Sequence, residues 1–137
     1  MAVGAGLSVS GMTNAADYPS RPLRLIVPFP PAGGTDIVGR VMAQRLGASL
    51  KQTVVIDNRP GAASLLGANI AAKSTPDGYT LLFATASFAI AASYYRQVLY
   101  DATRDFDAIG QFATAPLVFV AHPTVKAMNL RELIELA

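Results

Sequence analysis

Residues 28–36 (PFPPAGGTD) contain the groups best suited to hold a ligand. An apolar run precedes this segment and apolar residues follow it at three- and four-residue steps, so it should join a strand to a helix. The N–H groups of Gly33, Gly34 and Thr35 would then lie at a helix start, where unpaired N–H groups and the helix dipole attract anions. A tight turn with no ligand is the simpler interpretation. Against it, two prolines would stiffen the loop and Asp36 could orient it.

A second candidate segment, residues 84–88 (ATASF), follows another apolar run. Thr85 and Ser87 place two hydroxyl groups beside the start of a predicted helix. Ligands of open parallel sheets bind beyond the carboxyl ends of the strands, and both candidate segments would lie there. Ser87 could equally be a helix N-cap with no further role, and the sequence leaves both interpretations open.

The sequence offers no pattern typical of catalysis. It has no cysteine and a single histidine, His122, so neither a reactive thiolate nor a metal-binding cluster is expected. It contains no G-x-S-x-G elbow and no Walker A motif, and Gly33-Gly34 does not fit the dinucleotide fingerprint. Arg59 could pair with an anion, but a lone arginine after a strand is more often structural. We therefore predict no catalytic residue, no metal, no cofactor and no enzymatic activity.

Composition indicates one globular domain. The 137 residues are 52% apolar and 15% charged, which provides enough apolar surface for a single core. The net charge of +2 comes from scattered residues without a basic run, so no nucleic-acid partner is expected. The longest apolar stretch, residues 81–95, is interrupted by hydroxyl side chains and is shorter than the ~20 residues that cross a bilayer. No direct membrane insertion is expected.

Apolar periodicity predicts alternating strands and helices, and hence a layered α/β domain with a mostly parallel sheet. Pro28 should end the first strand, and Thr35 or Asp36 should cap the first helix. Asn129 followed by Glu132 forms a variant of the capping box that should start the last helix. The predicted strands are residues 23–27, 53–56, 79–85, 109–114 and 117–121, and the predicted helices are residues 37–50, 65–73, 87–95 and a last one from residue 129.

The two ends of the sequence carry further signals. Residues 1–16 have no charged side chain and end in two small residues, Ala15 and Ala16. They look like the later part of a secretory signal peptide without its positively charged n-region, or else like a flexible N-terminus. Export to the periplasm is therefore expected. The last predicted helix has only just begun at Ala137, which suggests a truncated chain.

Several spaced strings together resemble one family. They are YPSRPLRLIVPFPPAGGTD at residues 18–36, VVIDNRPGA at 54–62, GA at 67–68, PDGYTLL at 76–82, YD at 100–101, DF at 105–106 and HP at 122–123. In this order and spacing they resemble the Bug/TctC family, the extracytoplasmic solute receptors of tripartite tricarboxylate transporters. The resemblance extends over residues 17–137, nearly the whole chain.

The resemblance implies a type II periplasmic-binding-protein-like fold, of which this chain would be an incomplete α/β parallel-sheet lobe. Residues 17–137 would form the N-terminal part of the first of two lobes, which close over a small carboxylated solute. The receptor would deliver that solute to the membrane subunits of the transporter. Two cleft loops would hold the ligand, partly through backbone groups and ordered water. Their implied ligand-binding residues are Phe29, Pro31, Ala32, Gly33, Gly34, Thr35, Asp36, Thr85, Ala86 and Ser87.

The chain departs from the family pattern in its loops and in its length. Ala32 stands where a glycine is common, which would alter loop flexibility, and Ala86 stands where a serine is frequent, which removes a hydroxyl group. Half of the cleft would be absent, so we expect the chain alone to bind solute weakly or not at all. Apolar surface left exposed should also cause association or poor solubility.

Two other interpretations remain open. The chain could be a phosphate- or nucleotide-binding α/β enzyme domain that uses the Gly33-Gly34 helix start, although it lacks a nucleophile–base pair. It could also be a non-functional remnant of a binding-protein gene. Carboxylates without phosphate should bind under the receptor hypothesis, and nucleotides should bind under the enzyme hypothesis.

Overall fold

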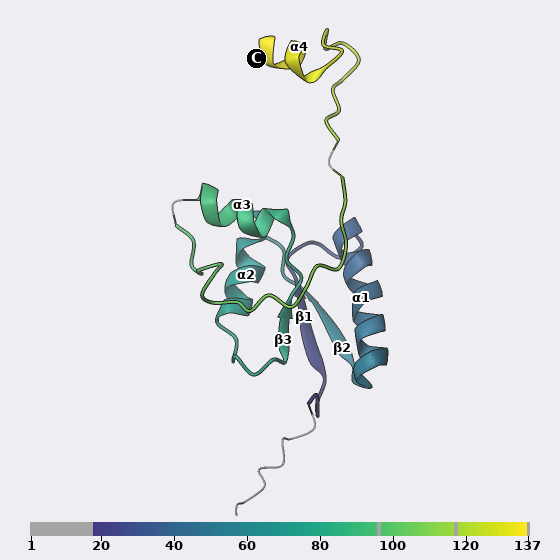
Figure 1. Ribbon diagram of the computed structural model, residues 1–137, viewed down its shortest axis with the longest axis vertical. Helices are drawn as coiled ribbons and strands as arrows, with labels where there is room; N and C mark the ends of the chain where they lie inside the picture. Colours follow the sequence, from purple (N-terminus) through teal and green to yellow (C-terminus); the bar gives the residue numbers. More distant parts are fainter. Residues whose placement is uncertain (1–17, 96, 117, 137) are drawn as a thin grey trace, which may run out of the picture.

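The computed structural model describes residues 18–95, 97–116 and 118–136 (Figure 1). Its centre is a parallel three-stranded sheet of β1 (Leu23–Val27), β2 (Val54–Asn58) and β3 (Thr80–Leu82), in the order β2-β1-β3. Leu25 of the central strand pairs with Ile56 on one side and Leu81 on the other. Because the strands are parallel, their carboxyl ends lie at one edge, which we call the carboxyl edge.

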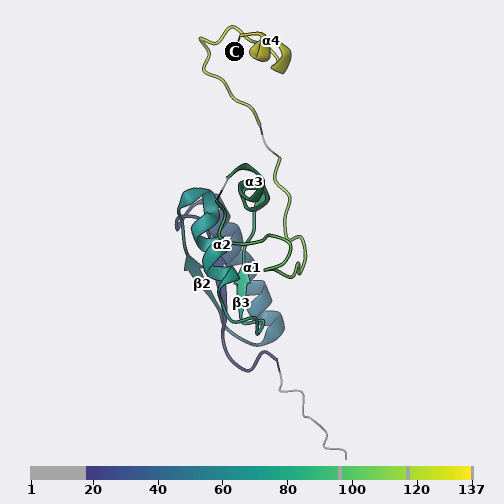
Figure 2. The same cartoon turned by 90° about the vertical axis from the view of Figure 1, so that its left-hand side faces the viewer.

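Helices cover both faces of this sheet. α1 (Gly34–Leu50) crosses from β1 to β2, whereas η1 (Ala62–Ser64) and α2 (Leu65–Ala72) cross from β2 past β1 to β3. Right-handed crossovers that run in opposite directions place α1 and α2 on opposite sides of the strands, as Figure 1 shows. α3 (Ala86–Tyr94) lies against η1 and α2 at the carboxyl edge, and α4 (Leu130–Glu135) stands apart from the sheet (Figure 2).

The central strand forms the core. Leu23, Leu25, Ile26 and Val27 are each at most 1% exposed, because β1 has a neighbouring strand on each side and a helix on each face. Leu25 and Val27 pack with Ala43 of α1. The continuous apolar sequence that predicted this strand is typical of parallel strands covered on both faces.

The outer strands differ from their predicted bounds at the carboxyl edge. β2 continues two residues past the predicted end, because Asp57 and Asn58 pair with the last residues of β1. β3 is shorter than the predicted strand 79–85, because the chain turns after Leu82 and Thr85 already precedes α3 as its N-cap. Both changes place polar side chains at the carboxyl edge.

The prediction of two strands within residues 109–121 is wrong for the residues that the structure describes there. Residues 109–116 and 118–121 form no strand, and residue 117 lies outside the described residues. This segment leaves the sheet and extends toward α4 (Figures 1 and 2). Val118, Phe119 and Val120 are 78–90% exposed. An apolar run becomes a strand only where a neighbouring strand pairs its N–H and C=O groups, and the described residues supply no such neighbour to this run.

Two predicted helix caps are also wrong. Gly33, rather than Thr35 or Asp36, is the N-cap of α1, and its carbonyl accepts the first helical hydrogen bond. Thr85, rather than Ser87, is the N-cap of α3. In each case the helix begins two or three residues before the polar residue that the sequence suggested as its cap, and the side chains of Asp36 and Ser87 contact other partners.

The last helix begins where the capping pattern predicts. Asn129 Oδ1 accepts a hydrogen bond from the Glu132 N–H group at 3.0 Å. The Glu132 carboxylate reaches back to the Met128 N–H group at 2.7 Å, one residue earlier than in the usual capping box. This local pattern forms α4 although no residue of the helix is buried.

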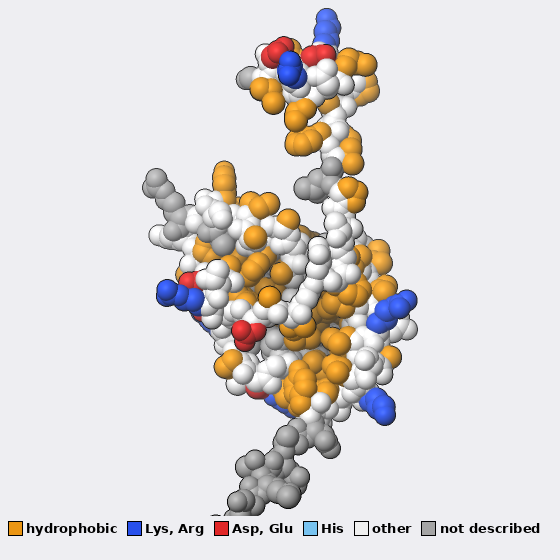
Figure 3. Space-filling model, in the orientation of Figure 1, with side chains coloured by type: hydrophobic (Ala, Val, Ile, Leu, Met, Phe, Trp, Pro, Cys, Tyr) orange, Lys and Arg blue, Asp and Glu red, His pale blue; other side chains and the backbone are white. Residues whose placement is uncertain are grey.

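Apolar side chains lie on the surface of the folded part. Figure 3 shows them gathered over one face, with lysine and arginine side chains at its margins. On α1, Ile37 is 57% exposed and Val41 is 45% exposed. Exposed apolar surface was expected from the sequence, and it favours association with other surfaces. None of the helices that the structure describes combines the length and apolar composition needed to span a bilayer.

The edge opposite the carboxyl edge is closed by the residues that lead into β1. Tyr18 Oη donates to the Gly78 carbonyl at 2.7 Å, and the Ser20 N–H group donates to Tyr79 Oη at 2.9 Å. The Arg21 guanidinium lies 4.1 Å from the centre of the Tyr79 ring. These contacts fix the lead-in segment to the turn that precedes β3.

Candidate functional site

The start of α1 is open to a ligand. Gly33 has no side chain to cap the helix, and the N–H groups of the exposed Gly34 and the partly exposed Thr35 find no acceptor among the described residues. An added Cβ atom at Gly34 would meet no atom within 4 Å, so the space beside it is free. Free N–H donors at the positive end of a 17-residue helix form an arrangement that can bind an anion.

Asp36 holds the loop before α1 from inside the fold. Its side chain is buried, with the residue 1% exposed. Asp36 Oδ2 accepts hydrogen bonds from the Ala32 N–H group at 2.9 Å and from Arg40 Nε at 2.8 Å, and Oδ1 accepts one from Asn58 Nδ2 at 2.8 Å. Both carboxylate oxygens are therefore occupied, and any contribution of Asp36 to ligand binding would be through the shape of the loop.

The donors around Asp36 also keep it ionised. The hydrogen bond from Arg40, followed by those from Asn58 and from the Ala32 N–H group, lowers the pKa of Asp36 from 3.8 to about 2. A carboxylate with so low a pKa remains charged at neutral and mildly acidic pH. The loop is thus held by a permanent negative charge, which stays close to the positive end of α1.

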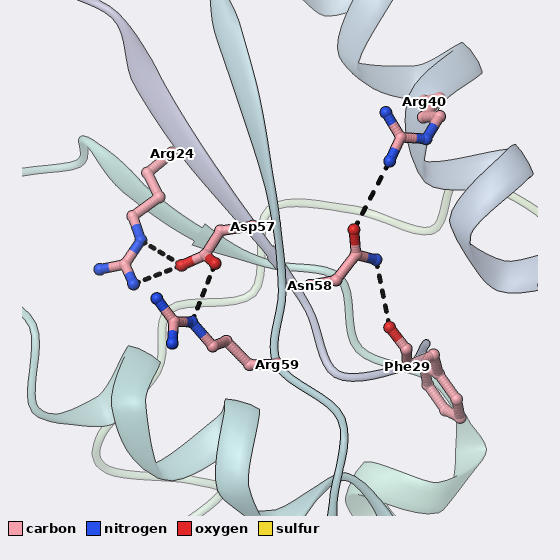
Figure 4. Close-up of polar contacts among 6 residues, drawn as sticks. All are labelled: Arg24, Phe29, Arg40, Asp57, Asn58 and Arg59. Atoms are coloured by element: carbon pink, nitrogen blue, oxygen red, sulfur yellow. Dashed lines mark hydrogen bonds and ion pairs between the residues drawn. The ribbon is translucent and has the colours of Figure 1, made fainter. Parts of the chain in front are cut away.

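Asn58 joins the same loop to β2. Its Nδ2 atom donates to the Phe29 carbonyl at 3.1 Å, and its Oδ1 atom lies 3.5 Å from an Arg40 guanidinium nitrogen (Figure 4). The same Nδ2 atom also donates to Asp36. The sequence interpretation considered the segment that begins at this residue but discussed only Arg59 in it. The available signal for a role of Asn58 was its place at the end of a strand, at the edge where parallel strands present ligand-binding side chains.

Ala32 adopts a backbone conformation that favours glycine. Its φ of 64° lies in the left-handed region, which costs an L-residue with a Cβ about 1–2 kcal/mol. This conformation turns the Ala32 N–H group toward Asp36, whose hydrogen bond offsets part of the strain. The substitution of alanine for a commoner glycine, noted from the sequence, thus falls at a position of real backbone strain.

The second predicted loop gathers hydroxyl groups at the start of α3. Thr85 Oγ1 lies 2.8 Å from Ser87 Oγ, and Ser87 Oγ lies 3.0 Å from Ser64 Oγ. Ser64 is 3% exposed, whereas Thr85 and Ser87 are partly exposed and Ala86 is exposed. The sequence interpretation missed Ser64, since it is distant in sequence from residues 84–88.

A left-handed turn carries Ser64 to this position. Gly61, Ala62, Ala63 and Ser64 have consecutive φ values of 133°, 46°, 52° and 77°. After this turn α2 packs closely on the first loop, since a Cβ atom at Gly67 would lie 2.7 Å from the Pro28 Cβ atom. The start of α2 therefore contacts the first loop through Gly67 and the second loop through Ser64.

The structure thus brings the two predicted loops to neighbouring positions at the carboxyl edge, where η1 and α2 contact both. Phe29 is half-buried and packs against the core, whereas Pro31 is exposed. Within the described residues, no hydrogen bond joins residues 28–36 directly to residues 84–88. Two shallow concavities lie elsewhere, one between α1 and β2 and one along α3, and no predicted site residue lines either of them.

Arg59 is engaged in an ion pair. Asp57 Oδ1 accepts from Arg59 Nε at 2.8 Å, and Asp57 Oδ2 accepts from Arg24 Nε at 2.8 Å (Figure 4). Burial alone would raise the pKa of Asp57, but the hydrogen bonds from Arg24 and Arg59 lower it below its usual value. The structural interpretation of Arg59 therefore agrees with its contacts.

Metal-ligand and catalytic groupings were not predicted, and the described residues contain no cluster of three His, Cys, Asp or Glu side chains able to hold a metal ion. His122 is exposed on the segment that leads to α4, where its Nδ1 atom lies 2.9 Å from Thr124 Oγ1. The hydroxyl of Ser87 contacts two other hydroxyls and, among the described residues, no base that could activate it.

Comparison with known families identifies the chain. The family described as tripartite tricarboxylate transporter family receptor (TctC) matches residues 38–137, and the chain belongs to this family. Protein BugT of Bordetella pertussis is 40% identical over 128 residues, which cover 92% of this chain and 39% of BugT. A UPF0065 protein from the tcbD-tcbE intergenic region of Pseudomonas sp. (strain P51) is 33% identical over 120 residues, covering 88% and 36%. The chain spans about two fifths of the length of these relatives.

Solved structures agree with this assignment. A structure of a periplasmic transporter has a TM-score of 0.58 and 44% sequence identity, with 61% of this chain and 29% of that chain covered. The structure of R. palustris Rpa4515 with adipate also has a TM-score of 0.58, with 39% identity, 62% of this chain and 29% of that chain covered. The predicted periplasmic-binding-protein-like α/β fold and its Bug/TctC family are confirmed.

Proposed function

We propose that this chain contributes one wall of an extracytoplasmic receptor, which captures a small carboxylated solute in the periplasm for a tripartite tricarboxylate transporter. The observation that carries the proposal is the start of α1, where the N–H groups of the exposed Gly34 and the partly exposed Thr35 have no acceptor among the described residues, while Asp36 fixes the loop. Membership of the TctC family and likeness to a structure with adipate support a carboxylate as the ligand. The membrane subunits of the transporter are the proposed partners.

The chemistry of the edge suits reversible capture. The nearby arginines are already paired, Arg40 with Asp36 and Arg59 with Asp57, so a carboxylate would be met by N–H and hydroxyl dipoles rather than by a free cation. Dipolar donors hold an anion without the strong desolvation cost of a buried ion pair. The absence of a nucleophile–base pair among the described residues also supports binding without reaction.

The proposed receptor would need more of the family fold than these residues supply. The chain spans 39% of BugT, so the opposite wall of a cleft would come from sequence that the chain does not match. A wall with donors on one side leaves most of a bound solute in water, and we expect affinity in the millimolar range, about −4 kcal/mol.

An NMR titration tests the proposal at residue level. Adipate, inorganic phosphate and ATP are added separately to ¹⁵N-labelled chain, and the amide shifts of Gly33, Gly34 and Thr85 are followed. Saturable shifts at these amides with adipate, and none with ATP, are expected. Shifts with ATP alone would favour the nucleotide-binding alternative. A spectrum unchanged by adipate at a concentration of tens of millimolar would contradict the proposal.

A further inference from the structure

The outer edge of β2 has no neighbouring strand among the described residues, because β2 ends the sheet order β2-β1-β3. The Thr53 carbonyl accepts a hydrogen bond from β1, and the Arg59 N–H group donates one to β1, so the odd-numbered residues face the sheet. Backbone groups of successive residues in a strand point to opposite sides. The residues whose N–H and C=O groups point away from the sheet are therefore Val54, Ile56 and Asn58.

The sequence of β2 does not protect this edge against another strand. Proteins often protect edge strands with lysine, proline or a bulge. β2 (VVIDN) contains neither lysine nor proline, and its register with β1 is continuous over all five residues. A further strand can therefore be added to β2 through main-chain hydrogen bonds.

The concavity between α1 and β2, which we call the β2 groove, lies beside this edge. Its volume is about 400 Å³, and its apolar lining includes Ala43, Val54 and Ile56. Arg40 and Gln44 of α1 add polar side chains to the lining. Alternate side chains of a strand point to the same face of a sheet. A segment added to β2 would therefore place every second side chain over the β2 groove.

The accessible charges around β2 are positive. The side chains of its two nearby carboxylates, Asp36 and Asp57, are only 2% and 21% exposed. Their arginine partners have side chains that are 40–55% exposed, namely Arg24, Arg40 and Arg59. Lys51, where α1 ends, is also exposed. Figure 3 shows basic and no acidic side chains along the margin that α1 occupies in Figure 1, so this surface complements an anionic segment.

A second copy of this chain would fit the edge less well. Antiparallel pairing of two β2 strands about Ile56 would bring the exposed cationic side chains of both copies to one interface. Like charges that face each other across a sheet are unfavourable. An extended segment rich in glutamate or aspartate offers the same main-chain hydrogen bonds without this repulsion.

We propose that the outer edge of β2 and the β2 groove bind an extended acidic segment of a partner protein, which joins the sheet as a further strand. Its N–H and C=O groups pair with those of Val54, Ile56 and Asn58. One row of its side chains covers the β2 groove, and its carboxylates neutralise the exposed cations. The inference does not rest on solute capture, because no predicted ligand-binding residue lines the β2 groove.

Amide hydrogen exchange followed by NMR tests the added strand. The probe is a capped peptide of alternating glutamate and valine, mixed with the ¹⁵N-labelled chain. The outward amides of Val54, Ile56 and Asn58 should exchange rapidly in the free chain and at least tenfold more slowly with the peptide. The amides of Val55 and Asp57 already pair with β1, so they are internal references. Unchanged exchange at the outward amides with millimolar peptide would overturn the proposal.

Two altered peptides separate main-chain pairing from charge attraction. N-methylation of alternate residues removes N–H donors and keeps the charge, and it should raise the dissociation constant at least tenfold. Replacement of every glutamate by lysine keeps the donors and reverses the charge, and it should weaken binding by a similar factor. Equal binding of the N-methylated peptide would overturn strand addition. Equal binding of the lysine peptide would overturn the acidic character of the partner.

Matched surface variants test whether the peptide lies over the β2 groove. Gln44→Glu places a negative charge in the groove and should raise the dissociation constant of the acidic peptide about threefold, as for one exposed charge pair. Ser49→Glu makes the same charge change at an exposed position of α1 that does not line the groove, and it should leave affinity unchanged. Equal effects of the two substitutions would contradict the proposed location.

A dilution series without peptide tests the alternative occupant. Exchange at the outward amides should not depend on the concentration of the chain. Protection that grows with concentration would overturn the proposal and identify a second copy as the occupant of the edge. The two proposals also fail separately: adipate that does not bind would contradict the receptor hypothesis, while the peptide measurements would still decide the role of β2.

Discussion

The β1–α1 loop and the β3–α3 loop reach the same edge of the sheet but are fixed by different chemistry. The first is held by a buried carboxylate, Asp36, whose oxygens accept from Ala32, Arg40 and Asn58. The second is held by neutral hydroxyls that contact one another. A buried carboxylate that accepts from three donors holds a loop in one shape, whereas the protons of hydroxyl groups can reorient. The pair would provide a rigid backbone site for one part of an anion and an adjustable donor for another.

The largest effect is expected from removing the charge of the Asp36 carboxylate, which distinguishes the first loop from the second. Asp36→Asn keeps the shape of the side chain, but it presents an amide nitrogen and a weaker, neutral acceptor to the three donors. Tm should therefore fall by roughly 10 °C or more. Thermal unfolding followed by circular dichroism measures this change. Asp107→Asn, at an exposed carboxylate of the same chain, is the control and should leave Tm nearly unchanged. A small change in Asp36→Asn would mean that the network does not hold the loop.

The dependence of stability on pH provides a second test of the Asp36 hydrogen bonds. The pKa of Asp36 is lowered to about 2 in the fold from 3.8, so its ionised form stabilises the fold at pH values above 3.8. This contribution should be lost as the pH falls from 3.8 toward 2. Urea unfolding at several pH values should show a loss of stability in this window that is reduced in Asp36→Asn. Equal pH dependence in the two proteins would count against the assignment.

Gly67 offers a test of the element that contacts both loops. A Cβ atom there would lie 2.7 Å from Pro28 Cβ and 3.0 Å from the Arg59 carbonyl, so α2 would have to shift. Gly67→Ala should lower the free energy of unfolding by about 1–3 kcal/mol and weaken adipate binding at both loops. Gly34→Ala is the matched control for stability, because an added Cβ at Gly34 meets no atom within 4 Å. Equal stability of the two variants would refute the close packing of α2.

The smallest expected effect concerns the backbone strain at Ala32 in the first loop. Ala32→Gly relieves the strain of a φ of 64° but gives the unfolded chain more freedom, so stability should rise by only about 0.5 kcal/mol. Urea unfolding with replicate measurements resolves a change of this size. A clear loss of stability would show that Ala32 is not strained in solution.

Local signals predicted much of this fold. The apolar run at residues 23–27 became β1, and the Asn129–Glu132 pattern became the start of α4. The start of α4 depends on neighbouring residues alone, whereas β1 also pairs with β2 and β3. The strands expected within residues 109–121 depend on a partner strand, which apolar sequence cannot guarantee. The α1 cap was missed because the Gly33 backbone, rather than a side chain, begins the helix.

The candidate site was predicted in its loops but not in the contacts that hold them. Residues 28–36 and 84–88 were identified because they follow strands and contain glycine or hydroxyl side chains. The contacts of Asn58 were not predicted, because its partners come from another loop. Ser64 was missed because Ala62 and Ala63 give no sign of the left-handed turn that brings it to Ser87. Long-range contacts of this kind follow from the packing of α2.

The contacts at the start of the described chain suggest where such a receptor could be attached to a label or a surface. They join Tyr18 and Ser20 to Gly78 and Tyr79. They fasten the start of the described chain to the edge of the sheet that faces away from both loops. A dye or a sensor chip linked close to this end would sit on the far side from the solute. Solute would then reach the carboxyl edge unhindered, and attachment and capture would not compete for the same surface.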